Sequence, residues 1–223
     1  MTPHAHVALL GDSIFDNGAY TRGAPDVVTH LRRLLPAGWR ATLCAVDGAT
    51  SRGVAAQLTC VPGVASHLVI AVGGNDALQN SDMLSLRVTS SAQALAVFGE
   101  RLTTFERTYR SAIREALALR RTTVVCTIYN GALEPGQATI ARLGVALFND
   151  VILRTALDHG LDVVELRAIC TEPADYANPI EPSEQGGLKI ARAIACAIGA
   201  VDRADVKPAR VWGSAAQPVG DYH

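Results

Sequence analysis

The sequence predicts an α/β protein: a doubly wound sheet of five parallel strands with helices on both faces. Short apolar runs alternate along the chain with longer segments of helical periodicity. The runs are continuously apolar rather than alternating, which is typical of strands buried on both faces of a parallel sheet. Five successive strand-and-helix units fit the flavodoxin-like arrangement of such a sheet.

Five apolar runs are predicted as strands. The first, HVALLG, and the third, SHLVIAVGG, both end in glycine, where a buried strand gives way to a turn. The predicted strands are residues 6–11, 40–47, 66–74, 122–130 and 161–166.

Helical periodicity predicts the segments between and after the strands. The first helix ends before Pro36 and the fourth ends at Gly160, two residues that commonly follow a helix. Gly99 is the expected point of any interruption in the long third helix. The predicted helices are residues 26–35, 50–58, 92–120, 140–160 and 183–199.

Composition indicates one globular domain, because 223 residues with 49% hydrophobic side chains can bury a sizeable core. Twenty Lys and Arg against 21 Asp and Glu leave no basic excess to indicate nucleic-acid binding. No apolar run reaches the roughly 20 residues of a membrane span. The N-terminus lacks a signal-peptide pattern, so we expect a cytoplasmic protein. We expect the domain to span residues 1–202 and residues 203–223 to form an irregular tail.

The cysteines do not predict a disulfide framework or a zinc site. There are five, an odd number, and no CxxC pair occurs. Most of them stand in apolar runs such as VVCTIY. We therefore expect them to act as small buried hydrophobic residues in the reduced state.

Polar residues follow three predicted strands at the point where each strand ends. Ser13 follows the first strand in LLGDS, Gly48 follows the second in VDGATS, and Asn75 follows the third in GGND. The carboxyl ends of parallel strands meet at one edge of the sheet, where ligands bind. A serine hydroxyl, a glycine N–H and an asparagine amide there would supply a nucleophile and donors for an oxyanion.

These segments resemble the SGNH (GDSL-type) hydrolase family, and the resemblance spans residues 6–199. GDSI, the glycine of VDGATS and GGND stand in the order of the family's first three sequence blocks. The resemblance implies that Ser13 is the nucleophile. It also implies an oxyanion hole made of the Ser13 N–H, the Gly48 N–H and the Asn75 amide. The substrates it implies are small-molecule esters, thioesters or acylated sugars, and it implies no metal or organic cofactor.

The last sequence block departs from the family pattern. The family has D-x-x-H before its final helix, whereas this chain has Asn178 and Glu181 at the corresponding positions of NPIE. Glu181 is then the candidate base, and Asn178 is expected to orient its carboxylate. An ordinary glutamate pKa of about 4.3, against about 6.5 for histidine, makes it the weaker base unless burial raises that pKa. The alternative is that Glu181 only complements the dipole of the following helix.

None of the six histidines is predicted as a substitute base. Four of them precede or begin strands, and so belong to the opposite edge of the sheet, roughly 20 Å away for strands of this length. His30 falls inside the first helix and His223 ends the tail. The four at strand starts are His4, His6, His67 and His159.

Three more residues are expected near the nucleophile. Asp12 and Asp16 flank Ser13 in the sequence, and Tyr129 ends the fourth strand, so all three are candidates to line the substrate pocket. Gly-Asp-Ser could instead be only a turn and helix cap. A phosphate-binding loop is not supported, because there is neither a P-loop lysine nor GxGxxG.

Three functions therefore stay open. The first is a hydrolase of small acyl esters. The second is a catalytically weak or inactive protein that binds a carboxylate or acylated ligand on the same scaffold. The third is an acyltransferase, in which an alcohol or sugar replaces water.

Overall fold

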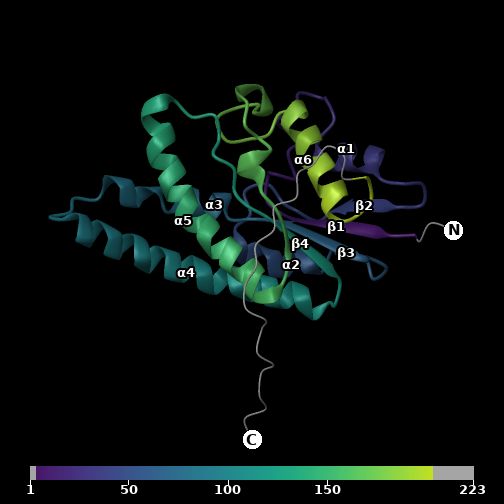
Figure 1. Cartoon of the computed structure of the whole chain (residues 1–223), viewed down its shortest axis with the longest axis horizontal. Coiled ribbons are helices and arrows are strands. Elements are labelled where there is room, and N and C mark those ends of the chain that lie inside the picture. The colour runs from purple at the N-terminus through teal and green to yellow at the C-terminus, as the bar shows by residue number, and fades with distance from the viewer. Residues whose placement is uncertain (1–3, 203–223) are drawn as a thin grey trace, which may run out of the picture.

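The computed structural model describes residues 4–202 and shows a central parallel sheet covered on both faces (Figure 1). The strand order is β2-β1-β3-β4-β5, and every neighbouring pair is parallel. This is the order of the flavodoxin-like doubly wound sheet, so the predicted fold class is confirmed. The strands are β1 (His6–Gly11), β2 (Arg40–Leu43), β3 (His67–Ala71), β4 (Thr122–Cys126) and β5 (Asp162–Val164).

Within residues 4–202, six α-helices surround the sheet, and each face has its own core. Alternate residues of β1 belong to different cores: Leu9 packs with α1 and α6, whereas Leu10 packs with α2, α4 and α5. This alternation follows from the two-residue period of a strand. The helices are α1 (Val27–Leu34), α2 (Val54–Leu58), α3 (Gly74–Gln79), α4 (Ser91–Ala118), α5 (Pro135–His159) and α6 (Glu184–Ala197).

Capping residues explain where several helices begin and end. The Asp26 side chain accepts from the Thr29 N–H at the start of α1, and Ser183 caps α6 in the same way through the Gly186 N–H. Gly160 ends α5 with a left-handed φ of +62°. These ends agree with the predicted boundaries to within a residue or two.

Four predicted strands are longer than the strands observed. Those predicted at residues 40–47, 66–74, 122–130 and 161–166 end at Leu43, Ala71, Cys126 and Val164. Gly73 has a φ of +131°, which breaks the strand and lets α3 begin at Gly74. That short helix is absent from the sequence prediction because GGND is indistinguishable from a loop by composition.

Three predicted helices also differ from those observed. The helix predicted at 50–58 is a 3-10 turn, η1 (Ser51–Gly53), followed by α2 from Val54. The helix predicted at 140–160 begins five residues earlier, at Pro135, whose fixed φ suits a first helical turn. The expected interruption near Gly99 does not occur, and α4 runs without a break through that residue. A single glycine costs only about 1 kcal/mol in a helix, which a 28-residue helix packed along its second half readily offsets.

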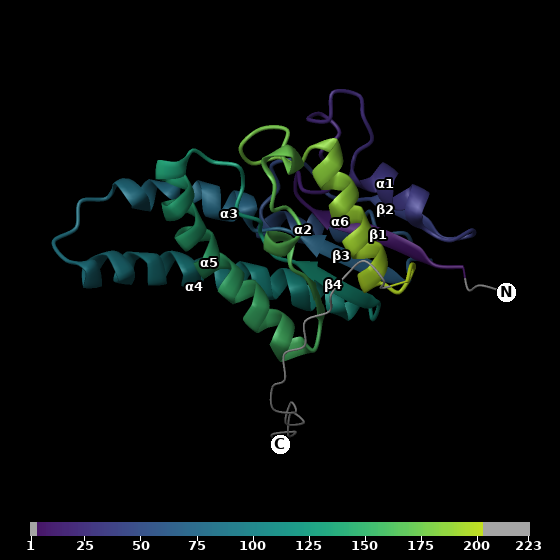
Figure 2. The same ribbon diagram turned by 45° about the horizontal axis from the view of Figure 1, so that its top comes forward.

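The first halves of α4 and α5 extend beyond the sheet (Figure 2). The first buried side chain of α4 is Phe105 and that of α5 is Phe148, so the preceding turns contribute no buried side chain. The short 3-10 helix η2 (Ser81–Ser85) lies between α3 and α4 in the sequence. Residues of η2 and of the first half of α5 line a cavity at the candidate active site.

Several chemical features of the described residues bear on function. No helix within residues 4–202 is both long and apolar enough to cross a membrane. The same residues contain no cluster of three or more His, Cys, Asp or Glu side chains suited to a metal ion. Four cysteines are buried and Cys60 is exposed. The predicted tail, residues 203–223, lies outside the described part of the chain.

Candidate active site

Ser13 stands directly after β1, and the end of that strand is held tightly. Gly11 has a φ of +132°, and a Cβ added to it would lie 1.7 Å from the Ala71 carbonyl oxygen. Only glycine fits this close approach of two backbones. The Gln57 side chain binds both backbone groups of Gly11, with N–H···Oε1 and Nε2···O distances of 2.7 Å. Gln57 is 46 residues away in the sequence, and nothing in its local pattern signals this role.

The turn that presents Ser13 is braced by Asp12. The Asp12 carbonyl accepts from the N–H groups of Phe15 and Asp16, both at 3.1 Å. Its carboxyl Oδ1 accepts from the Ile14 N–H at 3.1 Å. These bonds hold the chain in one tight turn, so the Ser13 hydroxyl points into the cavity with the residue only 7% exposed.

Glu181 lies in hydrogen-bond contact with Ser13. The Ser13 hydroxyl donates to Glu181 Oε1 at 3.1 Å, although the two residues are 168 positions apart. Glu181 is 6% exposed, and within residues 4–202 its Oε2 has no hydrogen-bond partner. Burial raises the pKa of Glu181, the Ser13 hydroxyl partly lowers it, and the nearby charge of Asp47 raises it further. The carboxylate is therefore a stronger base than a solvated glutamate.

The segment around Glu181 is held in place by the side chains of Asn178 and Tyr129. Asn178 Oδ1 accepts from the N–H groups of Ile180 and Glu181, both at 2.9 Å. The Tyr129 hydroxyl donates to the Ile180 carbonyl at 2.6 Å. Asn178 thus differs from its predicted role, because its side chain binds the main chain of the turn and not the carboxylate. An asparagine two or three residues before the N–H groups it binds is well placed for such a turn.

Asn17 connects the two halves of the site, a role that nothing in the sequence signals. Its side chain is fully buried, its Oδ1 accepts from the Val27 N–H at 3.0 Å, and its Nδ2 donates to the Pro182 carbonyl at 3.2 Å. One amide thereby joins the loop after β1, the start of α1 and the segment that carries Glu181. The neighbouring Asp16 is equally polar in the sequence, so composition alone cannot separate the two.

Asn75 lies in the first turn of α3 and lines the same cavity as Ser13. Its Nδ2 donates one hydrogen to the Ala49 carbonyl at 3.0 Å, which leaves the second amide hydrogen for another acceptor. Asp76 anchors this turn, because its carboxylate accepts from the N–H and the hydroxyl of Ser51 at 2.9 and 2.7 Å. The Asn75 amide is therefore held in position from two sides.

Gly48 and Asp16 lie beside the cavity rather than among its lining residues. Gly48 is exposed in the turn closed by the Ala49 N–H and the Val46 carbonyl, and its φ of +76° suits the third position of a type II turn. The Asp16 carboxylate accepts from the Asp47 N–H at 3.0 Å, which ties this turn to the loop after Ser13. Asp16 thus positions the Gly48 turn instead of facing the cavity.

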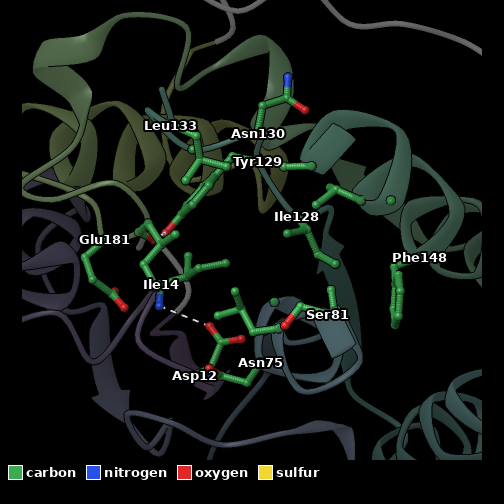
Figure 3. A pocket seen from close by; sticks show the side chains of 18 of the residues that line it. Asp12, Ile14, Asn75, Ser81, Ile128, Tyr129, Asn130, Leu133, Phe148 and Glu181 are labelled. Atoms are coloured by element: carbon green, nitrogen blue, oxygen red, sulfur yellow. Dashed lines mark hydrogen bonds between the residues drawn. The ribbon is translucent and has the colours of Figure 1, made fainter. Parts of the chain in front are cut away.

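Figure 3 shows the cavity, which has a volume of about 160 Å³. Asp12, Asn75 and Glu181 lie toward one end of it, and Phe148 lies at the other, with Ile128 between. The predicted pocket residues Asp12 and Tyr129 both line it. Polar groups are thus concentrated near Ser13, and the remainder is mainly apolar.

Asp12 is a second buried carboxyl at this end of the cavity. It is 2% exposed, and its Oδ2 has no hydrogen-bond partner among the residues described. Burial raises the pKa of Asp12 to about 7, the Ile14 N–H opposes that rise, and the nearby charge of Glu181 adds to it. Asp12 therefore holds its proton at mildly acidic pH.

The histidines of residues 4–202 are engaged elsewhere. His6 and His67 begin β1 and β3 at the opposite edge, where His6 contacts Thr42 and His67 stacks on Trp39. His30 lies on α1 with its Nε2 3.3 Å from Glu184 Oε1. His4 contacts the Gly38 carbonyl, and His159 is the last residue of α5. The side chain in contact with Ser13 is a carboxylate.

Comparisons with known proteins agree with this fold. A family model described as the GDSL-like Lipase/Acylhydrolase family matches residues 9–186. No curated protein matches the chain.

Solved structures of ester hydrolases resemble it at low sequence identity, which shows a shared fold. An extracellular lipase from Streptomyces rimosus is 18% identical, with 86% of this chain and 99% of that one covered and a TM-score of 0.64. A phospholipase A1 from Streptomyces albidoflavus NA297 is 18% identical, with coverage of 87% and 100% and a TM-score of 0.65. An acetylxylan esterase from Geobacillus stearothermophilus is 21% identical, with coverage of 87% and 94% and a TM-score of 0.64.

Proposed function

This chain belongs to the GDSL-like Lipase/Acylhydrolase family, and on that premise we propose that it is an ester hydrolase with a Ser–Glu pair. Ser13 is the nucleophile and Glu181 the general base. The observation that carries this proposal is the 3.1 Å hydrogen bond from the Ser13 hydroxyl to Glu181 Oε1. A nucleophile and a base in such contact are the usual arrangement for acyl transfer through a covalent intermediate.

In the first half of the reaction, Ser13 Oγ attacks the acyl carbonyl carbon as its proton passes to Glu181. The oxyanion that forms needs donors aimed at it. Within the described residues, neither the Ser13 N–H nor the Gly48 N–H has an acceptor, and Asn75 keeps one amide hydrogen unused. These groups are the proposed oxyanion hole. Collapse of the intermediate transfers the proton from Glu181 to the leaving alcohol and leaves an acyl group on Ser13.

In the second half, water attacks the acyl-enzyme. Glu181 takes a proton from that water and returns it to Ser13 Oγ when the carboxylic acid leaves. A carboxylate is an adequate base here because burial raises its pKa toward the operating pH, where a general base is most effective. The bond to Tyr129 through Ile180 and the Asn178 turn keep Glu181 in place through both steps.

Two other functions were left open by the sequence. A binding protein without turnover would be favoured by a Glu181 that faced solvent or paired with arginine, and the contact with Ser13 supports the enzyme instead. An acyltransferase would use the same acyl-enzyme and differ only in the acceptor. Product analysis with added alcohols distinguishes it from a hydrolase.

The test is hydrolysis of p-nitrophenyl butyrate as a function of pH by the wild type, Ser13→Ala, Glu181→Gln and Asn75→Ala. We expect each of the first two changes to lower kcat by about 10³-fold or more, since the pair acts as a unit. Loss of one oxyanion donor in Asn75→Ala should lower kcat by roughly 10²–10³-fold. Glu100→Gln, at an exposed carboxylate on α4, is the matched control and should leave kcat unchanged.

The pH profile reports the base directly. Glu181 works when deprotonated, so the rate should fall as the pH drops through its pKa, at a midpoint above the ordinary value of 4.5. A fluorophosphonate should label Ser13 covalently whatever the natural substrate is, and mass spectrometry locates the adduct. Activity kept in a folded Glu181→Gln variant but lost in Ser13→Ala would assign the base to another residue.

A further inference from the structure

The cavity beside Ser13 continues as an apolar groove that leads away from the carboxyl groups. Among the described residues, no charged side chain lines its far part, and the polar lining groups beyond the reacting end are Ser81 and Asn130. Phe148 lies at the end opposite Glu181 in Figure 3. The aliphatic lining comes from four separate segments and includes Leu78, Met83, Leu84, Ile128, Leu133 and Val145.

One face of α5 forms a wall of this groove. The lining residues of α5 are Ile140, Ala141, Gly144, Val145 and Phe148, whose spacing of three or four positions places them on a single face. From Ile140 to Phe148 the helix advances about 12 Å at 1.5 Å per residue. The wall is thus a straight apolar strip several carbon–carbon bonds long.

The groove keeps aliphatic side chains in contact with water. Leu84 and Ile140 are each 51% exposed, and Leu78 is 48% exposed, although all three line the groove. Neighbouring aliphatic residues left exposed around a concave site usually mark a surface that an apolar ligand covers. Because the groove begins at Ser13, the ligand that fits it is the acyl portion of the substrate.

We propose that this groove binds a straight fatty acyl chain, so that the enzyme prefers medium-chain acyl esters to acetyl esters. This inference rests on the proposed function of Ser13 and adds the class of acyl group. The carbonyl carbon lies at Ser13 Oγ, and the chain extends along α5 toward Phe148. The alcohol part then faces the open side of the site.

Gly144 is the residue that determines the chain length which the groove accepts. It lies in the middle of the α5 wall, and a Cβ added there would meet no atom within 4 Å. A larger side chain at this position therefore enters the open groove without disturbing the fold. Replacing a glycine inside a helix generally stabilises the helix. Helix stability therefore does not explain why position 144 lacks a side chain.

The first experiment compares kcat/KM for p-nitrophenyl acetate, butyrate and octanoate. Each methylene that leaves water contributes roughly fourfold, or about 0.8 kcal/mol. We therefore expect octanoate to exceed acetate by at least about 30-fold in the wild type, allowing for incomplete burial of its six additional methylenes. A flat or falling series would overturn the proposal.

Gly144→Leu tests the position of the chain. It should lower kcat/KM for octanoate at least tenfold and lower the octanoate-to-acetate ratio by a similar factor. Gly99→Leu is the matched control, because Gly99 is also inside a long helix with open space around its Cα but does not line the groove. Equal losses on both esters, or an unchanged octanoate-to-acetate ratio, would contradict the assignment of Gly144.

Binding of free octanoate gives a readout that does not depend on turnover. Calorimetric titration should show octanoate binding at least tenfold more weakly to Gly144→Leu than to the wild type, with Gly99→Leu unchanged. Selective octanoate binding without Ser13-dependent hydrolysis would support the acyl-binding groove and refute the proposed esterase function. Ser13-dependent hydrolysis of acetate, with no preference for octanoate and no octanoate binding, would support the esterase function and refute the acyl-binding groove.

Discussion

Replacement of Asp12 by asparagine should change the pH dependence of stability. Asp12 is 2% exposed, and its pKa rises from 3.8 to about 7 on folding, chiefly through burial. Between these two values the folded chain holds a proton that the unfolded chain has lost. Raising the pH through this window therefore favours unfolding, and above about pH 7 the effect is complete.

The magnitude follows from the size of the shift. About three pKa units, at 1.36 kcal/mol each, amount to about 4 kcal/mol of stability lost between pH 4 and pH 7. Asp12→Asn removes this titration but keeps an oxygen that can accept from the Ile14 N–H, the bond that Asp12 Oδ1 makes at 3.1 Å. The variant should match the wild type near pH 4 and be more stable by about 4 kcal/mol at pH 8.

Urea denaturation at pH 4, 5.5, 7 and 8 measures the difference, with unfolding free energies taken by linear extrapolation. Asp162→Asn removes an exposed carboxyl group at the start of β5 and serves as the control substitution. A difference between Asp12→Asn and the wild type that is the same at every pH would refute the reasoning. It would mean that the pKa of Asp12 is the same in the folded and the unfolded protein.

Two further predictions concern the support of the site. Tyr129→Phe removes the hydroxyl that donates to the Ile180 carbonyl at 2.6 Å. It should lower kcat on p-nitrophenyl butyrate by roughly fivefold and stability by about 1 kcal/mol, and an unchanged kcat would show that Tyr129 only packs. Gly11→Ala brings a Cβ to 1.7 Å from a carbonyl oxygen and should lower stability by more than about 4 kcal/mol or prevent folding. Gly23→Ala, at a positive φ in open space, should lose only about 1 kcal/mol in thermal unfolding, and equal losses in the two variants would contradict the steric argument.

The order of strands and helices could be read from the sequence because it depends on local periodicity. The run HVALLG forms the buried strand β1. The segment after Asp26, with its helical spacing of apolar residues, forms α1, and Asp26 is its N-cap. Element ends were less predictable, because they depend on single backbone conformations. The positive φ of Gly73, which stops β3 and starts α3, has no counterpart in hydrophobic pattern.

The residues of the candidate site were likewise only partly predictable from the sequence. Ser13, Asn75 and Glu181 could be selected from short motifs and their order, and the structure brings all three to one cavity. Gln57 and Asn17 could not be selected in this way, because each binds a residue that only the fold brings close. Gln57 binds Gly11, 46 residues away, and Asn17 binds Pro182, 165 residues away. In the sequence, neither side chain can be distinguished from any other glutamine or asparagine.

The sequence by itself determined the doubly wound sheet. It predicted which edge of that sheet carries Ser13 and that Glu181 stands in place of the family's histidine. The tertiary structure decided the chemical environment of the acidic residues beside Ser13. The raised pKa values of Asp12 and Glu181 arise from burial, which is a property of the assembled fold and not of either residue. The groove along α5 is likewise built from segments that meet only when the chain packs, so its apolar character is visible only in three dimensions.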